Sequence, residues 1–194
     1  MRVSAGRATA AGRIRIIGGT LRNSRLEVPD LPGLRPTAER VRETLFNWLA
    51  PMIVGARCLD LCAGTGALGI EALSRGAASV QFVERDARAA QALRRNLERL
   101  KVVAGQVAAV EAGQFLQGAP QAHDLVFLDP PFALELWTAL ARQLEQAGWL
   151  AAQAWIYVES PRGAIPALPS SWRLHREGLA GEVRFALYQR QPGQ

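Results

Sequence analysis

Cysteine and histidine are scarce in this sequence. Its 194 residues include two cysteines, Cys58 and Cys62, and two histidines, His123 and His175. Two cysteines cannot form a disulfide framework, and no histidine lies near them in the sequence to complete a zinc site. Hydrophobic residues make up 49% of the chain, enough to build a core without such cross-links. We therefore expect a reduced, intracellular protein without a bound metal.

Long hydrophobic runs are also missing. No stretch of about 18 uncharged apolar residues is present, so no membrane-spanning helix is expected. The first twelve residues contain arginines and small residues but no apolar segment, which argues against a secretory signal. These observations predict a cytoplasmic protein that does not bind a membrane.

Basic charge is concentrated in the first quarter of the chain. Residues 1–50 hold nine arginines against four acidic residues, whereas the remainder holds 14 basic and 13 acidic residues. Nearly all of the net charge of +6 therefore lies in this first segment. A basic extension on a near-neutral body favours a polyanionic partner, with RNA or DNA as the first candidates. A solvated arm without a partner is the alternative.

The basic segment is predicted to form a small hairpin. Residues 13–17 and 21–28 alternate as short strands do, and the pair Gly18-Gly19 between them is typical of a turn. We accordingly divide the chain at residue 36. Residues 1–36 form a basic extension, and residues 37–194 form the main domain.

The main domain alternates between helical and strand patterns. Thr37 is predicted to cap a helix that ends at Leu49. Strands are then expected over residues 58–61, 80–83, 107–110, 125–128, 155–158, 172–176 and 183–190, with helices over 67–75, 85–100, 112–116 and 134–147, and a turn at 178–181. Repeated strand–helix units predict an α/β fold with a doubly wound, mainly parallel seven-stranded sheet, closed by an antiparallel hairpin.

A glycine-rich loop follows the first strand of this domain. Gly64, Gly66 and Gly69 match the pattern G-x-G-x-x-G, which lets a backbone approach a nucleotide closely. Glu84 follows the next strand, where a carboxylate can accept both hydroxyls of a ribose. Taken alone, the pattern fits NAD as well as any other nucleoside ligand.

An aspartate before the glycines favours one ligand over NAD. Asp60 ends the first strand, where its charge would repel a pyrophosphate but suit an ammonium group. S-adenosylmethionine has that group, a ribose and no phosphate. At the third strand end, Glu111 and Ala112 are placed to meet the adenine. The candidate cofactor-binding residues are Asp60, Ala63, Gly64, Thr65, Gly66, Glu84, Arg85, Glu111 and Ala112.

The most specific pattern lies at the fourth strand end, where the sequence reads Leu128-Asp129-Pro130-Pro131-Phe132. Two successive prolines fix the backbone and remove two N–H donors. What remains are acceptors, namely carbonyls and the Asp129 carboxylate, which suit an amino group that must donate hydrogen bonds. Phe132 offers a ring on which a planar base can stack.

These motifs resemble those of amino-methyltransferases that carry a [D/N]-PP-[Y/F] sequence. The N-terminal blocks and the tail extend the resemblance to residues 13–190 and make it closest to the RsmD family of 16S rRNA guanine-N2 methyltransferases. The matching segments are Arg13-Ile14 through Ile17-Gly18-Gly19, Arg35-Pro36-Thr37, Arg40-Val41-Arg42-Glu43-Thr44-Leu45-Phe46-Asn47 and Gly181-Glu182-Val183-Arg184-Phe185-Ala186-Leu187-Tyr188.

The resemblance implies transfer of a methyl group from S-adenosylmethionine to a guanine amine in 16S rRNA of the small ribosomal subunit. The expected catalytic residues are Asp129, Pro130 and Phe132, and the expected RNA-binding residues are Arg22, Arg25, Arg35, Thr37, Arg40, Arg42, Pro131 and Phe132. A monomer is the default expectation. The alternatives are methylation of adenine N6, of cytosine N4 or of a protein glutamine amide, an NAD-dependent oxidoreductase, and a non-enzymatic rRNA-binding assembly factor.

Overall fold

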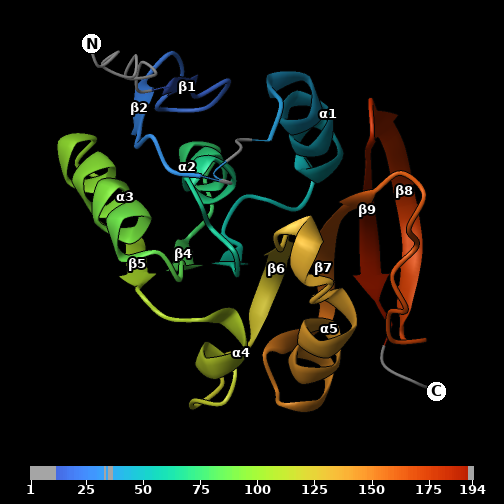
Figure 1. The fold of residues 1–194 in the computed structure, drawn as a ribbon. Helices are drawn as coiled ribbons and strands as arrows, with labels where there is room; N and C mark the ends of the chain where they lie inside the picture. Colours follow the sequence, from blue (N-terminus) through green and yellow to red (C-terminus); the bar gives the residue numbers. More distant parts are fainter. Residues whose placement is uncertain (1–11, 33, 35–36, 192–194) are drawn as a thin grey trace, which may run out of the picture.

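The computed structural model describes residues 12–32, 34 and 37–191 (Figure 1). Its centre is a seven-stranded sheet in the order β5-β4-β3-β6-β7-β9-β8. The sheet is parallel from β5 to β7, and β9 runs antiparallel to both of its neighbours. The strands are β3 (Arg57–Asp60), β4 (Ser79–Val83), β5 (Gly105–Ala108), β6 (His123–Leu128), β7 (Leu150–Pro161), β8 (Trp172–Ala180) and β9 (Val183–Arg190). The predicted doubly wound α/β fold with its closing hairpin is confirmed.

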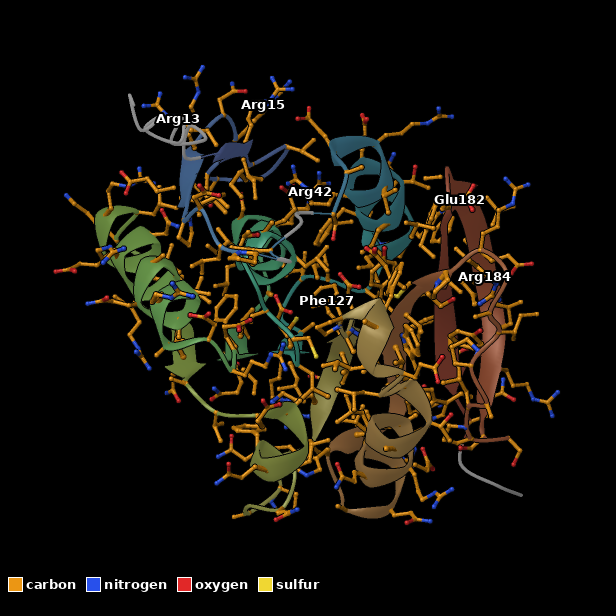
Figure 2. The ribbon with its side chains drawn as sticks, in the orientation of Figure 1. Arg13, Arg15, Arg42, Phe127, Glu182 and Arg184 are labelled. Carbon is orange, nitrogen blue, oxygen red and sulfur yellow. The ribbon has the colours of Figure 1, made fainter. Side chains whose placement is uncertain are left out.

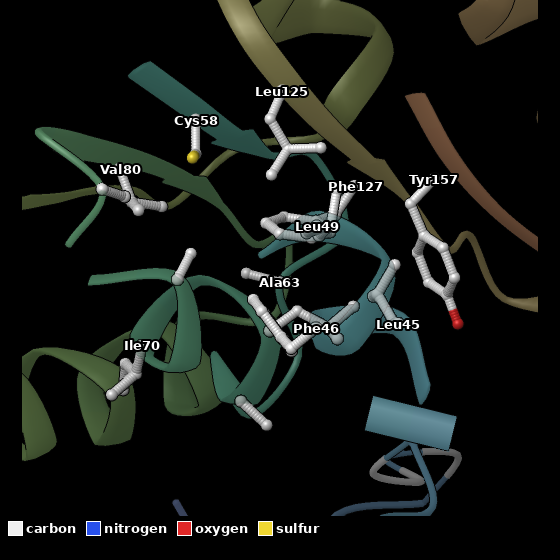
Figure 3. Close-up of a cluster of buried hydrophobic side chains, with 14 of the residues drawn as sticks. Leu45, Phe46, Leu49, Cys58, Ala63, Ile70, Val80, Leu125, Phe127 and Tyr157 are labelled. Atoms are coloured by element: carbon white, nitrogen blue, oxygen red, sulfur yellow. The ribbon is translucent and has the colours of Figure 1, made fainter. Parts of the chain in front are cut away.

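Helices cover both faces of the sheet because strand side chains alternate between them (Figure 1). Phe127 faces the layer of α1 (Glu39–Leu49), α2 (Ala67–Ser74) and α3 (Ala87–Arg99). Its neighbours Val126 and Leu128 face α4 (Ala112–Phe115) and α5 (Trp137–Gln146). Figure 3 shows the first cluster, in which the Phe127 ring lies 6.1 Å from Phe46 of α1 and 6.3 Å from Tyr157 of β7.

The N-terminal hairpin packs on the main domain. It consists of β1 (Gly12–Arg15) and β2 (Arg25–Val28), which pair antiparallel. The buried side chains of the hairpin belong to the cluster beneath α1, α2 and α3; they are Ile14, Leu26 and Val28 of the two strands and Ile16, which directly follows β1. The side chain of Asn96 in α3 both donates to and accepts from the backbone of Glu27, at 2.9 and 3.0 Å. The hairpin is therefore docked by apolar packing and by hydrogen bonds.

A buried carboxylate fixes the turn of this hairpin to α2. Both oxygens of Glu71 accept backbone N–H groups, those of Ile17 and Gly18, each at 2.8 Å. The same carboxylate pairs with Arg75 at 2.7 Å and with Arg42 at 3.7 Å, and Glu71 itself is fully buried. Two arginines and two amides thus surround one charge that could not be buried alone.

Glycine is required at the point where the turn meets α2. Gly19 has φ +75°, and an added Cβ would lie 1.8 Å from the backbone oxygen of Ser74. That oxygen accepts the N–H of Thr20 at 2.8 Å, and the Ser74 hydroxyl accepts the N–H of Leu21 at 2.9 Å. The Gly18-Gly19 pair therefore serves a close approach between backbones as well as a turn.

Several predicted elements differ from the structure at their boundaries, and the first hairpin strand ends at Arg15 instead of residue 17. The second hairpin strand begins at Arg25 instead of residue 21, because Asn23 adopts φ 68° in the preceding turn. The predicted helix over 134–147 begins at Trp137, because Glu135 adopts φ 49° and ends a short 3-10 helix at Phe132–Leu134. The third strand of the main domain is β5 (Gly105–Ala108) instead of 107–110.

The closing strands also differ from the prediction. β7 runs from Leu150 to Pro161, well beyond the predicted 155–158, with a register shift opposite β6. β8 continues to Ala180, so the turn falls at Gly181 and Glu182 instead of 178–181. Gly178 belongs to the strand, and its missing side chain leaves room for the ring of Phe185.

Candidate functional site

Four of the parallel strands end in acidic residues at one edge of the sheet. Asp60 ends β3, Glu84 follows β4, Asp129 follows β6, and Glu159 lies near the end of β7. Because these strands are parallel neighbours, their carboxyl ends lie at the same edge, where ligands of doubly wound folds bind. The edge therefore offers many hydrogen-bond acceptors.

Asp60 supports the glycine loop from below. It is 3% exposed, and its carboxylate accepts the N–H of Gly69 at 3.0 Å. Gly66, the N-cap residue of α2, has no side chain that could cap the helix, so Asp60 supplies the acceptor instead. Burial, opposed by the Gly69 hydrogen bond and reinforced by the charge of Glu84, raises the pKa of Asp60 to about 7.

Glu84 shapes the loop from the other side. One carboxylate oxygen accepts the N–H of Gly64, and the other accepts the N–H of Asp86, both at 2.7 Å. Each carboxylate oxygen has two lone pairs, so these bonds leave acceptor capacity for a ligand. Glu84 is partly exposed, as a residue that accepts ribose hydroxyls must be.

The loop between these carboxylates needs two glycines in left-handed conformations. Gly64 has φ +53° and Gly66 has φ +75°. An added Cβ on Gly66 would lie 2.2 Å from Leu93 of α3, and one on Gly64 would lie 3.2 Å from Leu34. The loop backbone therefore packs closely against Leu93 of α3 and Leu34 of the segment before α1, with little or no room for side chains at these two positions. Thr65 is buried, and its hydroxyl accepts the N–H of Ala67 at 3.3 Å, so it completes the turn.

The remaining predicted cofactor residues lie beside this loop. Ala63 is buried and donates its N–H to the Val83 carbonyl at 2.9 Å. Arg85 and Glu111 approach to 3.7 Å with side chains 51% and 58% exposed. Glu111 precedes α4 as its N-cap residue and makes no side-chain capping bond, while Ala112 is buried. The exposed carboxylate of Glu111 is accessible to a polar ligand edge.

The segment Asp129 to Phe132 carries the acceptors predicted at the β6 end. Asp129 is half-buried, Pro130 buried and Pro131 exposed. Phe132 is partly exposed, and its ring lies 5.8 Å from that of Trp137. Burial, followed by the charges of Glu159 and Asp60, raises the pKa of Asp129.

Sequence reasoning missed the carboxyl group beside Asp129. Glu159 is 5% exposed, and the hydroxyl of buried Tyr157 donates to it at 2.7 Å. The Trp137 indole donates to the Glu159 backbone oxygen at 2.6 Å. A signal was present in the sequence, because Glu159 directly follows the predicted strand over 155–158, as Asp129 follows the strand over 125–128.

Three of the arginines that were predicted to bind RNA are exposed in the structure, whereas Arg42 is buried. Arg22, Arg25 and Arg40 are exposed, and Arg13 and Arg15 lie on the same hairpin (Figure 2). Arg35 lies outside the described residues. The exposed arginines of the hairpin and α1 form a basic surface, which we call the hairpin surface and define as Arg13, Arg15, Arg22, Arg25 and Arg40.

Arg42 corrects the prediction that it contacts phosphate. It is 2% exposed, and its guanidinium donates to the backbone oxygens of Arg15 at 3.1 Å and Thr37 at 3.3 Å. Its charge is neutralised by Glu71. Arg42 is therefore part of the docking of the hairpin and has no exposed guanidinium for RNA.

Thr37 also departs from its predicted role. Ala38 is the N-cap residue of α1 and makes no side-chain capping bond. The side chain of Thr37 instead hydrogen-bonds the carboxylate of Glu159. Thr37 thus links the segment before α1 to the end of β7.

One cysteine, Cys62, lies at this edge of the sheet, two residues after the end of β3, and burial followed by the charge of Asp129 raises its pKa. Cys58 is buried in the core, where burial raises its pKa, and His123 stacks on Trp149 at the other end of β6. Among residues 12–32, 34 and 37–191, no three His, Cys, Asp or Glu side chains gather as metal ligands would. In the same ranges, no helix is long and apolar enough to cross a membrane.

Comparison with known proteins identifies the family. The family model described as Conserved hypothetical protein 95 matches residues 14–189. Ribosomal RNA small subunit methyltransferase D of Escherichia coli K12 is 52% identical over 184 residues, which cover 94% of this chain and 93% of that protein. The chain belongs to the RsmD family. The resemblance read from the sequence motifs is thereby confirmed.

Other RsmD relatives and a solved structure agree. The protein of the same name from Haemophilus influenzae is 44% identical over 93% of this chain and 95% of that protein. The solved structure of yhhF from Escherichia coli superposes with a TM-score of 0.88 at 49% identity, covering 94% of this chain and all of that chain. The doubly wound α/β fold of this chain is therefore the fold of class I methyltransferases, and it matches the yhhF structure over nearly its whole length.

Proposed function

We propose that the protein transfers the methyl group of S-adenosylmethionine to the exocyclic N2 amine of one guanine in 16S rRNA of the small ribosomal subunit. The observation that carries the proposal is the Asp129-Pro130-Pro131-Phe132 segment at the acidic edge of the sheet, in a chain of the RsmD family. We propose a monomer, because one chain supplies every residue of the site, and a cytoplasmic reaction, because its proposed partner is the ribosome.

The acidic edge fits the proposed cofactor. Its strand ends offer Asp60, Glu84 and Glu111, which suit an ammonium group, ribose hydroxyls and an amino-purine. A pyrophosphate at the glycine loop would meet the like charge of Asp60, which disfavours NAD. A cationic ligand would also hold Asp60 ionised, although burial raises the pKa of its carboxyl to about 7.

When bound, S-adenosylmethionine supplies a methyl group on positively charged sulfur. The task of the protein is then to place an amine in line with that methyl group and to exclude water. Asp129 and the Pro130 carbonyl accept the two N2 protons, which orients the amine and raises the electron density on its nitrogen. Asp129 takes up the proton that the methylated amine releases. Phe132, packed on Trp137, holds the extruded base.

Methyl transfer to defined substrates tests the proposal. Labelled S-adenosylmethionine is offered with small subunits that lack the modification, and naked rRNA, DNA and ribosomal proteins are run in parallel. We expect label as N2-methylguanosine at one site by nucleoside mass spectrometry. Label in adenine, cytosine or protein would replace the proposed substrate. No transfer despite S-adenosylmethionine binding would favour the assembly factor, and NADH binding alone would favour the oxidoreductase.

Glu84→Gln is expected to weaken S-adenosylmethionine binding by about 1.5–3 kcal/mol, the usual contribution of a hydrogen bond to a charged group. The amide oxygen can still accept one loop N–H, so the loop retains support while the ribose loses a charged acceptor. Calorimetric titration measures the dissociation constant. The matched control is Glu98→Gln, an exposed carboxylate on α3, which leaves it unchanged. An unchanged constant for Glu84→Gln would refute the ribose assignment.

Removing charge from the hairpin surface is expected to reduce the salt dependence of rRNA binding. The triple variant Arg13→Gln, Arg22→Gln and Arg25→Gln removes three exposed charges. The slope of log affinity against log salt should fall by about 0.7–0.9 for each phosphate that the variant no longer neutralises. Fluorescence anisotropy at several salt concentrations measures it.

A second triple variant controls for net charge. Arg142→Gln, Arg173→Gln and Arg176→Gln remove three exposed charges from α5 and β8, far from the hairpin (Figure 1). Its slope should stay close to that of the parent. Equal slopes for the two triple variants would show that the hairpin surface does not contact RNA.

A further inference from the structure

Two carboxyl groups stand side by side at the ends of β6 and β7. Leu128, the last residue of β6, pairs with Val158 of β7 in the parallel register, and Asp129 and Glu159 are the residues that directly follow this pair. Strand alternation places them on the same face as Phe127 and Tyr157, whose rings lie 6.3 Å apart. Burial raises the pKa of Asp129, and the charges of Glu159 and then Asp60 raise it further.

Neutral donors hold Glu159 in place. The Tyr157 hydroxyl donates to its carboxylate at 2.7 Å, and the Thr37 hydroxyl donates as well. Within the described ranges, no lysine, arginine or histidine forms an ion pair with this carboxylate. A carboxylate has about four acceptor positions, so two hydroxyls leave about half of them for another donor.

This arrangement costs stability in the absence of a ligand. Burying a carboxylate without a cation is unfavourable, and a second carboxylate beside it adds repulsion. The Tyr157 and Thr37 hydroxyls keep the Glu159 carboxylate oriented but do not neutralise it. Such a pair at the ligand-binding edge of the sheet indicates a site built to receive hydrogen-bond donors.

We propose that Glu159 accepts the N1–H of the target guanine while Asp129 accepts the neighbouring N2 amine. The inference rests on the proposed function and names the residue that selects the base. Guanine presents N1–H and N2–H donors next to each other. Adenine and cytosine present a single amine beside an unprotonated ring nitrogen, which would face the Glu159 carboxylate as acceptor against acceptor. The paired carboxylates therefore favour guanine over the other amino bases.

The analogue 2-aminopurine, which lacks both the N1 hydrogen and the O6 carbonyl of guanine, tests this contact in combination with a change at Glu159. It keeps the 2-amino group that receives the methyl group, but its N1 is an acceptor without a hydrogen. Glu159→Gln reverses the protein side of the contact, because the amide nitrogen can donate to that N1 while the amide oxygen still accepts from Tyr157. Nucleoside mass spectrometry first locates the methylated guanine. Small subunits are then reconstituted from 16S rRNA carrying guanine or 2-aminopurine there.

The expected result is a change in base preference. The parent should favour guanine over 2-aminopurine by about 10²-fold or more in kcat/KM, as sites that hydrogen-bond a polar edge do. Glu159→Gln should lose about 10²-fold on guanine and shift the guanine-to-2-aminopurine ratio by at least about tenfold, with unchanged S-adenosylmethionine affinity. The difference in intrinsic reactivity between guanine and 2-aminopurine is the same for both proteins, so it cancels when the ratio of the parent is compared with the ratio of Glu159→Gln. Equal losses on both bases, or no loss on guanine, would overturn the proposal.

Two further variants complete the experiment. Glu182→Gln makes the same substitution at an exposed position in the β8–β9 turn (Figure 2). It should leave the guanine-to-2-aminopurine ratio of kcat/KM the same as in the parent. Tyr157→Phe replaces the test if Glu159→Gln does not fold, because it removes one of the hydroxyls that orient the carboxylate. It should lower the preference for guanine by at least about threefold. An unchanged preference would then overturn the proposal.

The parent protein separates this inference from the proposed function. If the parent methylates another base or a protein, the proposed function fails, and the role of Glu159 fails with it. If the parent produces N2-methylguanosine and Glu159→Gln keeps the same base preference, the proposed function stands and only the role of Glu159 is refuted.

Discussion

Asp129→Ala should reduce methyl transfer by about 10³-fold or more while S-adenosylmethionine binding changes little. The loss follows from removing the acceptor that orients the amine and takes up its proton, effects that together contribute several powers of ten. Single-turnover transfer to small subunits measures the chemical step, and calorimetric titration measures cofactor affinity. Asp129 lies at the β6 end, beside the cofactor loop but outside it, which is why the two readouts should separate.

Asp129→Asn is the matched control for this prediction. Its amide oxygen can still accept one N2 proton, but the amide cannot take up the proton that the methylated amine releases, so activity should fall between the parent and Asp129→Ala. Both variants also remove the repulsion between the Asp129 and Glu159 carboxylates. Because Asp129 forms no favourable charge pair within the described part of the chain that would be lost, we expect no loss of stability from electrostatics in either variant. A loss of cofactor affinity as large as the loss of rate would show that Asp129 mainly holds the cofactor.

Glu71→Ala should destabilise the protein by about 3–5 kcal/mol. The substitution leaves buried Arg42 without its counter-charge and leaves the Ile17 and Gly18 N–H groups without their acceptor. Urea unfolding, analysed at constant m value, measures the difference. Glu71→Gln keeps an acceptor oxygen and should lose less.

An exposed glutamate provides the control for Glu71. Glu43 lies on the solvent side of α1, and Glu43→Ala should change the free energy of unfolding by no more than about 0.5 kcal/mol. A loss below about 1 kcal/mol for Glu71→Ala would contradict the view that this carboxylate holds the hairpin to α2.

Most of the fold could be predicted because its signals are local. The alternation of strand and helix patterns fixed the order of elements, and strand ends in a parallel sheet lie together by topology. Asp60, Glu84 and Asp129 could therefore be placed at one edge from sequence alone. Boundaries were less accurate where single residues adopt left-handed conformations, as Asn23 and Glu135 do, because neither residue type requires that conformation.

Non-local pairing explains the errors at Arg42 and Glu159. An arginine on an amphipathic helix usually lies in solvent, and only the fold brings Glu71 of α2 to Arg42 of α1. The proposed role of Glu159 depends on the β6–β7 register, which places it beside Asp129. It also depends on the hydrogen bond with Thr37, which lies more than a hundred residues earlier in the sequence. Both interactions depend on how distant elements pack.

Helix α2 has a consequence for how RNA is engaged. Its first turn begins at the glycine loop, and its last turn holds the N-terminal hairpin through Glu71 and Ser74. Eight residues of helix span roughly 12 Å. In the proposed complex, α2 therefore sets a fixed distance between the hairpin surface, which contacts the phosphate backbone, and the site that holds the methyl donor. The nucleic acid is the more deformable partner, so its conformation adjusts to that distance when the base is extruded.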